Sequence, residues 1–222
     1  MDPGRVFYIT KSQPASGVVY TILDSDSTTR LYTVETSQKA KPHMTLIRHR
    51  CPYQQMAAPA CHYPSPSPPC AHPPVQVPFG GSNSGTVVST VSFHGLSSKI
   101  GISLYSGPQP MEMTMKRSDL LAGGRKFDSP LGRMQWKGGD SIFTSSQKLV
   151  DQHKRVIARY EKRSSLLSRQ MDQFILLVQD ANVIANLDMV IVTGLATIEY
   201  TRRSDKEWDE VLEEVAETVF DV

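Results

Sequence analysis

The chain has 222 residues, of which 39% are hydrophobic and 21% charged. This composition excludes a wholly disordered polymer, and the length allows one domain with a sizeable core and a modest appendage. The formal net charge of +2 at pH 7 hides an asymmetry, because residues 205–222 carry a net −7 and the residues before them +9. A basic body attracts anionic surfaces, although an acidic tail can equally shield it.

The N-terminus, "MDPGRVFYIT", lacks the basic region followed by an apolar run that marks a secretory signal peptide. We therefore expect no secretion by this route. The three cysteines all lie in one proline-rich stretch, which argues against a disulfide framework. An intracellular location, cytoplasmic or peripheral to a membrane, is the expectation.

Short segments rich in Val, Ile, Tyr and Thr occupy the first fifty residues: "RVFYIT", "GVVYTIL", "RLYTVET" and "MTLIRHR". Their length and their spacing of about ten residues are typical of antiparallel strands. The pattern then stops, since residues 51–85 hold nine of the fifteen prolines. Proline cannot donate to a sheet ladder, so we predict a disordered insertion that interrupts one domain.

Cysteine and histidine cluster in and beside this insertion, at His49, Cys51, Cys61, His62, Cys70 and His72. These are zinc-type ligands, but their spacing matches no standard zinc motif. Chance composition of a disordered loop is the favoured interpretation, so no metal or other cofactor is predicted. The insertion also contains "PSPP", Pro66–Pro69, a minimal ligand for a polyproline-binding partner.

Strand-like runs resume after the insertion: "TVVSTVSFH", "KIGISLYS", "MEMTMKR", "GRMQWKGG", "DSIFTS", "KRVIARYEKR" and "MDQFILLVQ". With short pieces near Lys126 and Leu149, the total is about twelve strands, as successive hairpins would form. The first convincing helix follows them, at residues 187–203.

The segment 187–203, "LDMVIVTGLATIEYTRR", is apolar around most of its circumference. At 1.5 Å per residue its seventeen residues span roughly 25 Å, and its uncharged core is shorter than the roughly twenty residues a bilayer span requires. We therefore predict no transmembrane segment. A helix apolar on all sides needs burial on all sides, and about twelve antiparallel strands can enclose it as a barrel. Gly194 would let a neighbouring backbone approach closely, and Arg202 and Arg203 would mark the helix end. Packing on one face of an open sheet is the alternative.

In this order of features the chain resembles a fungal family of unknown function within the superfamily of tubby C-terminal domains, phospholipid scramblases and LURP-one-related proteins. The features are the run of short strands, the tryptophan strand "GRMQWKGG", the strand "RVIARYEKR" and the final helix. The likeness covers residues 5–204 except the insertion. It implies a mainly β, closed twelve-stranded barrel around a central hydrophobic helix. Tubby domains bind phosphoinositides, but none of their ligand residues is matched individually here.

The basic residues of "KRVIARYEKR" are the candidate ligand-binding site: Lys154, Arg155, Arg159, Lys162 and Arg163. Alternate residues of a strand share a face, so Arg155, Arg159 and Arg163 are expected to project outward together and to attract phosphate groups. A solvated strand surface is the competing interpretation.

Residues 205–222 read as a separate acidic helix, with Trp208, Val211, Leu212, Val215 and Val219 at helical spacing. Its apolar stripe is expected to dock on the barrel formed by residues 1–204 or on another protein. Its acidity makes insertion into an anionic membrane improbable.

Catalytic signatures such as GxSxG and HExxH do not occur, and "GGSNSG" lacks the lysine of a phosphate-binding loop. The prediction is a non-enzymatic module that binds anionic phospholipid or phosphoinositide peripherally through the basic face, with no specific nucleic-acid partner. An adaptor that uses Pro66–Pro69 or the helix at 205–220 is the alternative, and scramblase-like lipid handling is a third hypothesis.

Overall fold

The computed structural model describes residues 4–15, 17–49, 85–94, 97–118, 124–138, 146–163 and 171–220. These residues form twelve strands and two helices. The strands are β1 (Arg5–Ser12), β2 (Val19–Leu23), β3 (Arg30–Thr36), β4 (Met44–His49), β5 (Gly85–Phe93), β6 (Ile100–Leu104), β7 (Met111–Arg117), β8 (Arg125–Ser129), β9 (Gly132–Gly138), β10 (Gln147–Asp151), β11 (Val156–Glu161) and β12 (Asp172–Leu176). The helices are α1 (Ala181–Ala185) and α2 (Leu187–Phe220).

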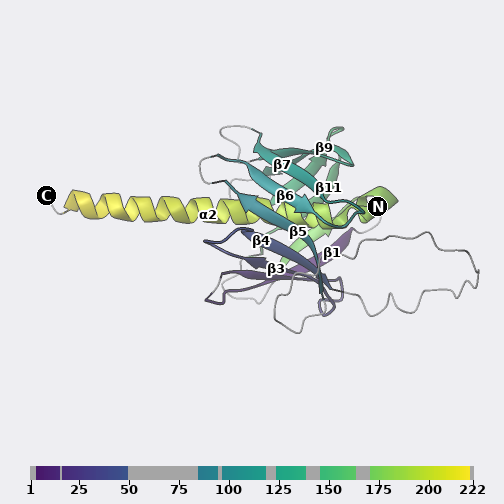
Figure 1. Ribbon diagram of the computed structural model, residues 1–222, viewed down its shortest axis with the longest axis horizontal. Coiled ribbons are helices and arrows are strands. Elements are labelled where there is room, and N and C mark those ends of the chain that lie inside the picture. Colours follow the sequence, from purple (N-terminus) through teal and green to yellow (C-terminus); the bar gives the residue numbers. More distant parts are fainter. Residues whose placement is uncertain are drawn as a thin grey trace, which may run out of the picture.

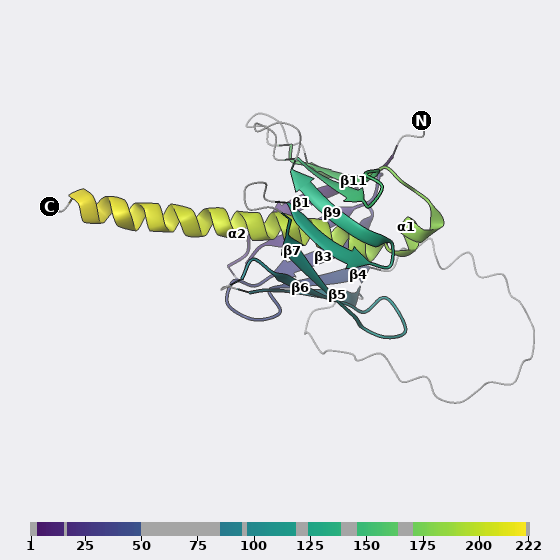
Figure 2. The same ribbon diagram turned by 90° about the horizontal axis from the view of Figure 1, so that it is seen from above.

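The strands form a closed antiparallel barrel in which each pairs with its neighbours in the chain. β1 and β12 close it, paired from Arg5 opposite Leu176 to Ile9 opposite Asp172. Figures 1 and 2 show the barrel wrapped around the first half of α2. The predicted closed barrel of about twelve strands is therefore confirmed. The short strands expected near Lys126 and Leu149 are β8 and β10, whereas "DSIFTS" and most of the insertion lie outside the described residues.

Strand alternation fills the barrel with apolar side chains. In β6, for example, Ile100, Ile102 and Leu104 are buried while the residues between them are half-buried. Each fully buried side chain of this size stabilises the fold by roughly 1.5–3 kcal/mol relative to exposure. Such inward residues from all around the barrel surround α2.

The first half of α2 is enclosed on every side, because all residues from Met189 to Thr197 are buried. This arrangement confirms the predicted central helix and excludes packing on one open sheet. The close neighbours of Gly194 are aromatic rings rather than backbone, since a Cβ there would lie 2.9 Å from atoms of both Trp136 and Phe174. Trp136 also donates from Nε1 to the Thr193 hydroxyl at 3.0 Å, so this strand and the helix are joined by packing and by a hydrogen bond.

The second half of α2 corrects the predicted boundary at residue 203. The helix continues without interruption to Phe220, so the expected separate helix at 205–222 is part of α2. No glycine or proline follows Gly194 before Phe220, and therefore nothing in the backbone chemistry ends the helix at the arginines. Figures 1 and 2 show residues 205–220, which we call the arm, projecting away from the barrel along the helix axis. The expected docking of this helix on the barrel is thus not found.

The barrel has two different ends. α1, capped by the Asp180 side chain, which accepts from the Val183 amide at 2.9 Å, lies where α2 enters the barrel. We call this the α1 end and the opposite one, where α2 leaves near Arg203, the exit end. Within the described part of the chain, no helix is both long enough and apolar enough to cross a bilayer.

Candidate anion-binding surface

The five basic residues predicted as a binding site do not form one patch. β11 begins at Val156 and ends at Glu161, so only Arg159 of the five lies within the strand. Lys154 and Arg155 belong to the β10–β11 turn at the α1 end, whereas Lys162 and Arg163 follow β11 at the exit end. At about 3.3 Å per residue, roughly 26 Å of extended chain separates Arg155 from Arg163. Arg155, Arg159 and Arg163 therefore do not share one strand face, since only Arg159 lies within β11.

Arg155 has a structural partner in the turn that it closes. Its Nε donates to Asp151 Oδ2 at 2.7 Å, and Asp151 Oδ1 accepts from the backbone amides of His153 and Arg155. Although desolvation by burial opposes ionisation, these hydrogen bonds, first of all that from the Arg155 side chain, hold the pKa of Asp151 below its ordinary value. The Arg155 charge is thus compensated locally.

Arg159 and Arg163 share one carboxylate at the other end of β11. Arg159 Nη1 lies 3.4 Å from Glu161 Oε1, and Arg163 Nη2 lies 3.9 Å from Glu161 Oε2. Lys154 and Lys162 are exposed and have no ion-pair partner among the described residues. Of the predicted set, Arg159, Lys162 and Arg163 can take part in a surface at the exit side, and Lys154 and Arg155 cannot.

A larger cationic surface comes from the pairing of neighbouring strands. Lys137 of β9 lies directly opposite Lys148 of β10, which in turn lies opposite Arg159 of β11. Lys116 of β7 is likewise opposite Lys126 of β8. These five residues lie on the outer face of the barrel, and we call them the cationic sheet face. Like charges directly opposite each other destabilise a sheet, so a bound anion would relieve the repulsion between the exposed Lys116 and Lys126.

Of the five residues of this surface, only Arg159 was predicted from the sequence. The positions are spread over 44 residues of chain, from Lys116 to Arg159, and only strand register brings them together. The signal that could have identified them is the occurrence of lysines at matching, outward-facing positions of neighbouring predicted hairpin strands.

The exit end as a whole is strongly basic. Its described side chains include only four acids outside the arm: Glu35, Glu161, Asp172 and Glu199. Its cations, which we call the basic rim, are Lys11, Lys39, Lys41, Lys99, Lys116, Arg117, Arg125, Lys126, Lys137, Lys148, Arg159, Lys162, Arg163, Arg202 and Arg203. At the α1 end the charges of the described residues nearly cancel, because this end has six cations and seven acids. The +9 of the body is therefore concentrated at one end.

Three of the rim arginines are committed to holding α2 in place. Glu199 is fully buried and accepts from Tyr20 at 2.8 Å, from Arg202 at 2.7 and 2.8 Å and from Arg203 at 2.9 Å. Although burial opposes ionisation, these hydrogen bonds, with Arg202 first, keep the pKa of Glu199 below its ordinary value. Desolvation and the neighbouring Glu199 charge raise the pKa of Tyr20.

The other contacts of these arginines reach the surrounding loops. Arg203 Nη2 donates to the Ser37 carbonyl at 2.8 Å, and its guanidinium lies 4.8 Å from the ring centroid of Phe93. The Arg125 guanidinium lies 3.9 Å from the Tyr200 ring centroid and donates to the Ser98 carbonyl. These arginines are structural, which leaves the exposed lysines as the groups available to a ligand.

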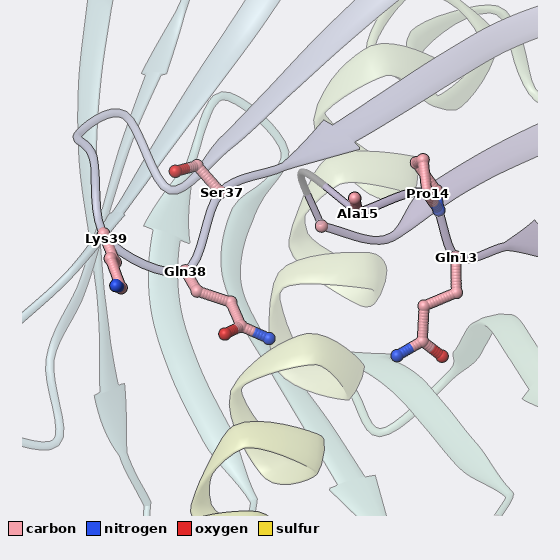
Figure 3. A pocket seen from close by; sticks show the side chains of 7 residues that line it. Gln13, Pro14, Ala15, Ser37, Gln38 and Lys39 are labelled. Atoms are coloured by element: carbon pink, nitrogen blue, oxygen red, sulfur yellow. The ribbon is translucent and has the colours of Figure 1, made fainter.

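A polar groove of about 510 Å³ opens at the exit end between the β1–β2 and β3–β4 loops. It is lined by Gln13, Pro14, Ala15, Gly17, Ser37, Gln38 and Lys39, and Figure 3 shows turns of α2 beside them. Among the described residues that line it, Lys39 is the only charged one, so the groove extends the basic rim.

Among the residues that the structure describes, no three His, Cys, Asp or Glu side chains come together as metal ligands would. The candidate ligands Cys51, Cys61, His62, Cys70 and His72 lie outside the described residues, as does Pro66–Pro69. Their predicted roles stay predictions.

Together, the fold and surface define a class of protein: a closed antiparallel barrel threaded by a helix, with one strongly cationic end. The chain belongs to a family of unknown function, DUF6593, which it matches over residues 16–204. The matched span ends where α2 leaves the barrel, so the arm lies outside it. Comparison with curated proteins and with solved structures found no match.

Proposed function

We propose that this protein is a non-enzymatic binding module that associates peripherally with anionic phospholipid, phosphoinositides included, through the cationic sheet face. The observation that supports this most is the row Lys137, Lys148 and Arg159 across three adjacent strands, with the Lys116–Lys126 pair beside it. Near an anionic leaflet each Lys or Arg contributes about 1 kcal/mol. The three exposed lysines of this face, Lys116, Lys126 and Lys137, would thus contribute about 3 kcal/mol toward reversible binding.

The position of this face suits a membrane despite the acidic arm. Twelve strands about 4.8 Å apart and tilted by roughly 40° give a barrel radius of about 12 Å. A barrel lying on its side thus keeps the arm axis farther from the lipid than the Debye length of about 8 Å at physiological salt. Docking by the exit end would instead drive the arm into the bilayer.

The resemblance to tubby domains supports the same ligand class, because barrel, central helix and feature order agree with that superfamily. Scramblase-like handling receives less support, since the apolar part of α2 is enclosed by the barrel.

The test compares two charge reversals of equal size. One variant carries Lys116→Glu, Lys126→Glu and Lys137→Glu on the cationic sheet face, and the control carries Lys11→Glu, Lys39→Glu and Lys41→Glu elsewhere on the basic rim. All six side chains are exposed, so both variants should fold. Sedimentation uses vesicles of phosphatidylcholine alone, with phosphatidylserine, or with a phosphoinositide.

We expect the wild type to bind the two anionic vesicle types in a salt-sensitive manner. The sheet-face variant should lose at least tenfold in affinity, and the control should lose much less. Equal losses would mean that overall charge alone is responsible, and absence of wild-type binding would refute the lipid function.

A further inference from the structure

We propose that the arm is a dimerisation element that pairs antiparallel with the arm of a second copy of this chain, so that each arm tip reaches the other copy's basic rim. This inference does not depend on the lipid function.

The first step is that the arm is held rigidly on the barrel axis. It continues a helix whose first half is fixed by Trp136, Phe174 and the Glu199 contacts, and no glycine or proline interrupts it. A continuous helix cannot turn back, so the arm cannot neutralise its charge or cover an apolar face against its own barrel. Both views show it clear of the strands (Figures 1 and 2).

The second step is the pattern of residues along the arm. At 3.6 residues per turn, Trp208, Val211, Leu212, Val215 and Val219 fall within an arc of about 100° on one helix face. The acids fall on the remaining circumference. An apolar stripe of this width is typical of a helix that packs against another helix.

The third step is that barrel geometry permits only one direction of pairing. Packed helices lie 8–10 Å apart, whereas each arm emerges from the centre of a barrel about 12 Å in radius. Parallel arms would make the two barrels collide. Antiparallel arms place the barrels at opposite ends, about 24 Å apart for sixteen helical residues.

The fourth step is charge. In one copy, Glu213, Glu214 and Glu217 lie about 15–21 Å along the helix from Arg203, beyond the screening length of its own basic rim. Antiparallel pairing brings these acids next to the rim of the other copy. A basic helix from another protein would also fit the arm, but it would add positive charge beside a rim that already has an excess. A second copy supplies a matching apolar stripe, acids for the first copy's basic rim and a basic rim for the first copy's acids.

The decisive test uses disulfide trapping in the full chain with Cys51, Cys61 and Cys70 changed to Ser. The two-fold axis of the antiparallel pair crosses the arm near Leu212, so Leu212→Cys should oxidise readily to a covalent dimer. Val219→Cys lies about thirteen residues along the pair from its twin, roughly 20 Å on the antiparallel geometry, and should not. Efficient trapping by Val219→Cys would overturn the arrangement.

Sedimentation velocity from 1 to 500 μM tests the association itself. We expect a salt-dependent monomer–dimer equilibrium in this range, abolished by Leu212→Glu. Lys39→Glu with Lys41→Glu on the rim should weaken it at least fivefold, while Arg30→Glu with Lys154→Glu at the α1 end should not. A monomer at every concentration, or equal weakening by both charge reversals, would refute the proposal.

Discussion

Glu199 anchors α2 at the point where the helix leaves the barrel. Its buried carboxylate joins Tyr20 of β2 to Arg202 and Arg203 one turn farther along the helix. Burial of a carboxylate is costly unless its hydrogen bonds compensate, and here four of them do. The depressed pKa of Glu199 records that compensation.

We predict that Glu199→Gln destabilises the protein by about 1–3 kcal/mol at pH 7, because the two arginines lose a charged acceptor. A carboxylate whose pKa is lower in the folded state contributes stability above its unfolded pKa, ordinarily 4.5, and this contribution is lost as pH falls through the folded pKa. Urea unfolding measured from pH 7 to pH 3 should therefore show wild type and variant converging at the acidic end. A constant difference would contradict the assignment.

Gly194 fixes how closely α2 approaches the barrel wall. In an exposed helix, Gly→Ala adds up to about 1 kcal/mol of stability. Here the new Cβ would meet Trp136 and Phe174 at 2.9 Å, and overpacking typically costs about 1–3 kcal/mol.

Gly194→Ala is thus predicted to lower the free energy of unfolding, although alanine has a higher helix propensity than glycine. Gly138→Ala is the matched control, because nothing lies within 4 Å of its added Cβ, and it should change stability by less than about 0.5 kcal/mol. Chemical denaturation of both variants gives the comparison. A stabilised Gly194→Ala would show that the rings can move aside.

At the scale of elements, α2 consists of two parts with different roles. Residues 189–197 are buried and belong to the core, whereas the arm leaves the barrel and lies beyond the family match. Removal of residues 205–222 is therefore predicted to change the unfolding free energy of the barrel by less than about 1 kcal/mol. Thermal and urea unfolding of dilute truncated protein measure this, and a loss of several kcal/mol would show that the arm supports the fold.

The barrel was predictable because local patterns determine its parts. Strand alternation identified β1 to β7, and a helix apolar on all sides, as at Val190, Ile191 and Leu195, required enclosure. The end of that helix was not predictable from Arg202 and Arg203. Arginines can mark a helix C-terminus, but here they lie within the helix, three and four residues after Glu199, and bind its buried carboxylate.

The candidate surface was mostly hidden from sequence analysis for a related reason. β11 was expected to include Arg155 and Arg163, but the turn at Asp151 and the end at Glu161 shorten it. Lys137 and Lys148 carry no local signal, because their alignment with Arg159 depends on the register of three strands.

At the scale of the whole molecule, the dominant feature is the separation of charge along one axis. The α1 end is nearly neutral, the exit end holds the excess of cations, and the arm beyond it carries seven acids against one lysine. Such a distribution orients the molecule in an external field. It also means that the arm and an anionic lipid surface, both negatively charged, compete for the cations of the basic rim.

Truncation after Ser204 should consequently strengthen binding to anionic vesicles, because it removes a net −7 and raises the formal charge from +2 to +9. We expect affinity for phosphatidylserine vesicles to rise at least threefold at 50 mM salt. The gain should disappear near 500 mM, where the screening length is shorter than the distance from arm to lipid. Submicromolar protein keeps both forms monomeric, so loss of arm pairing does not enter the comparison. Unchanged or weaker binding of the truncated chain would show that the arm's charge does not reach the lipid-binding face.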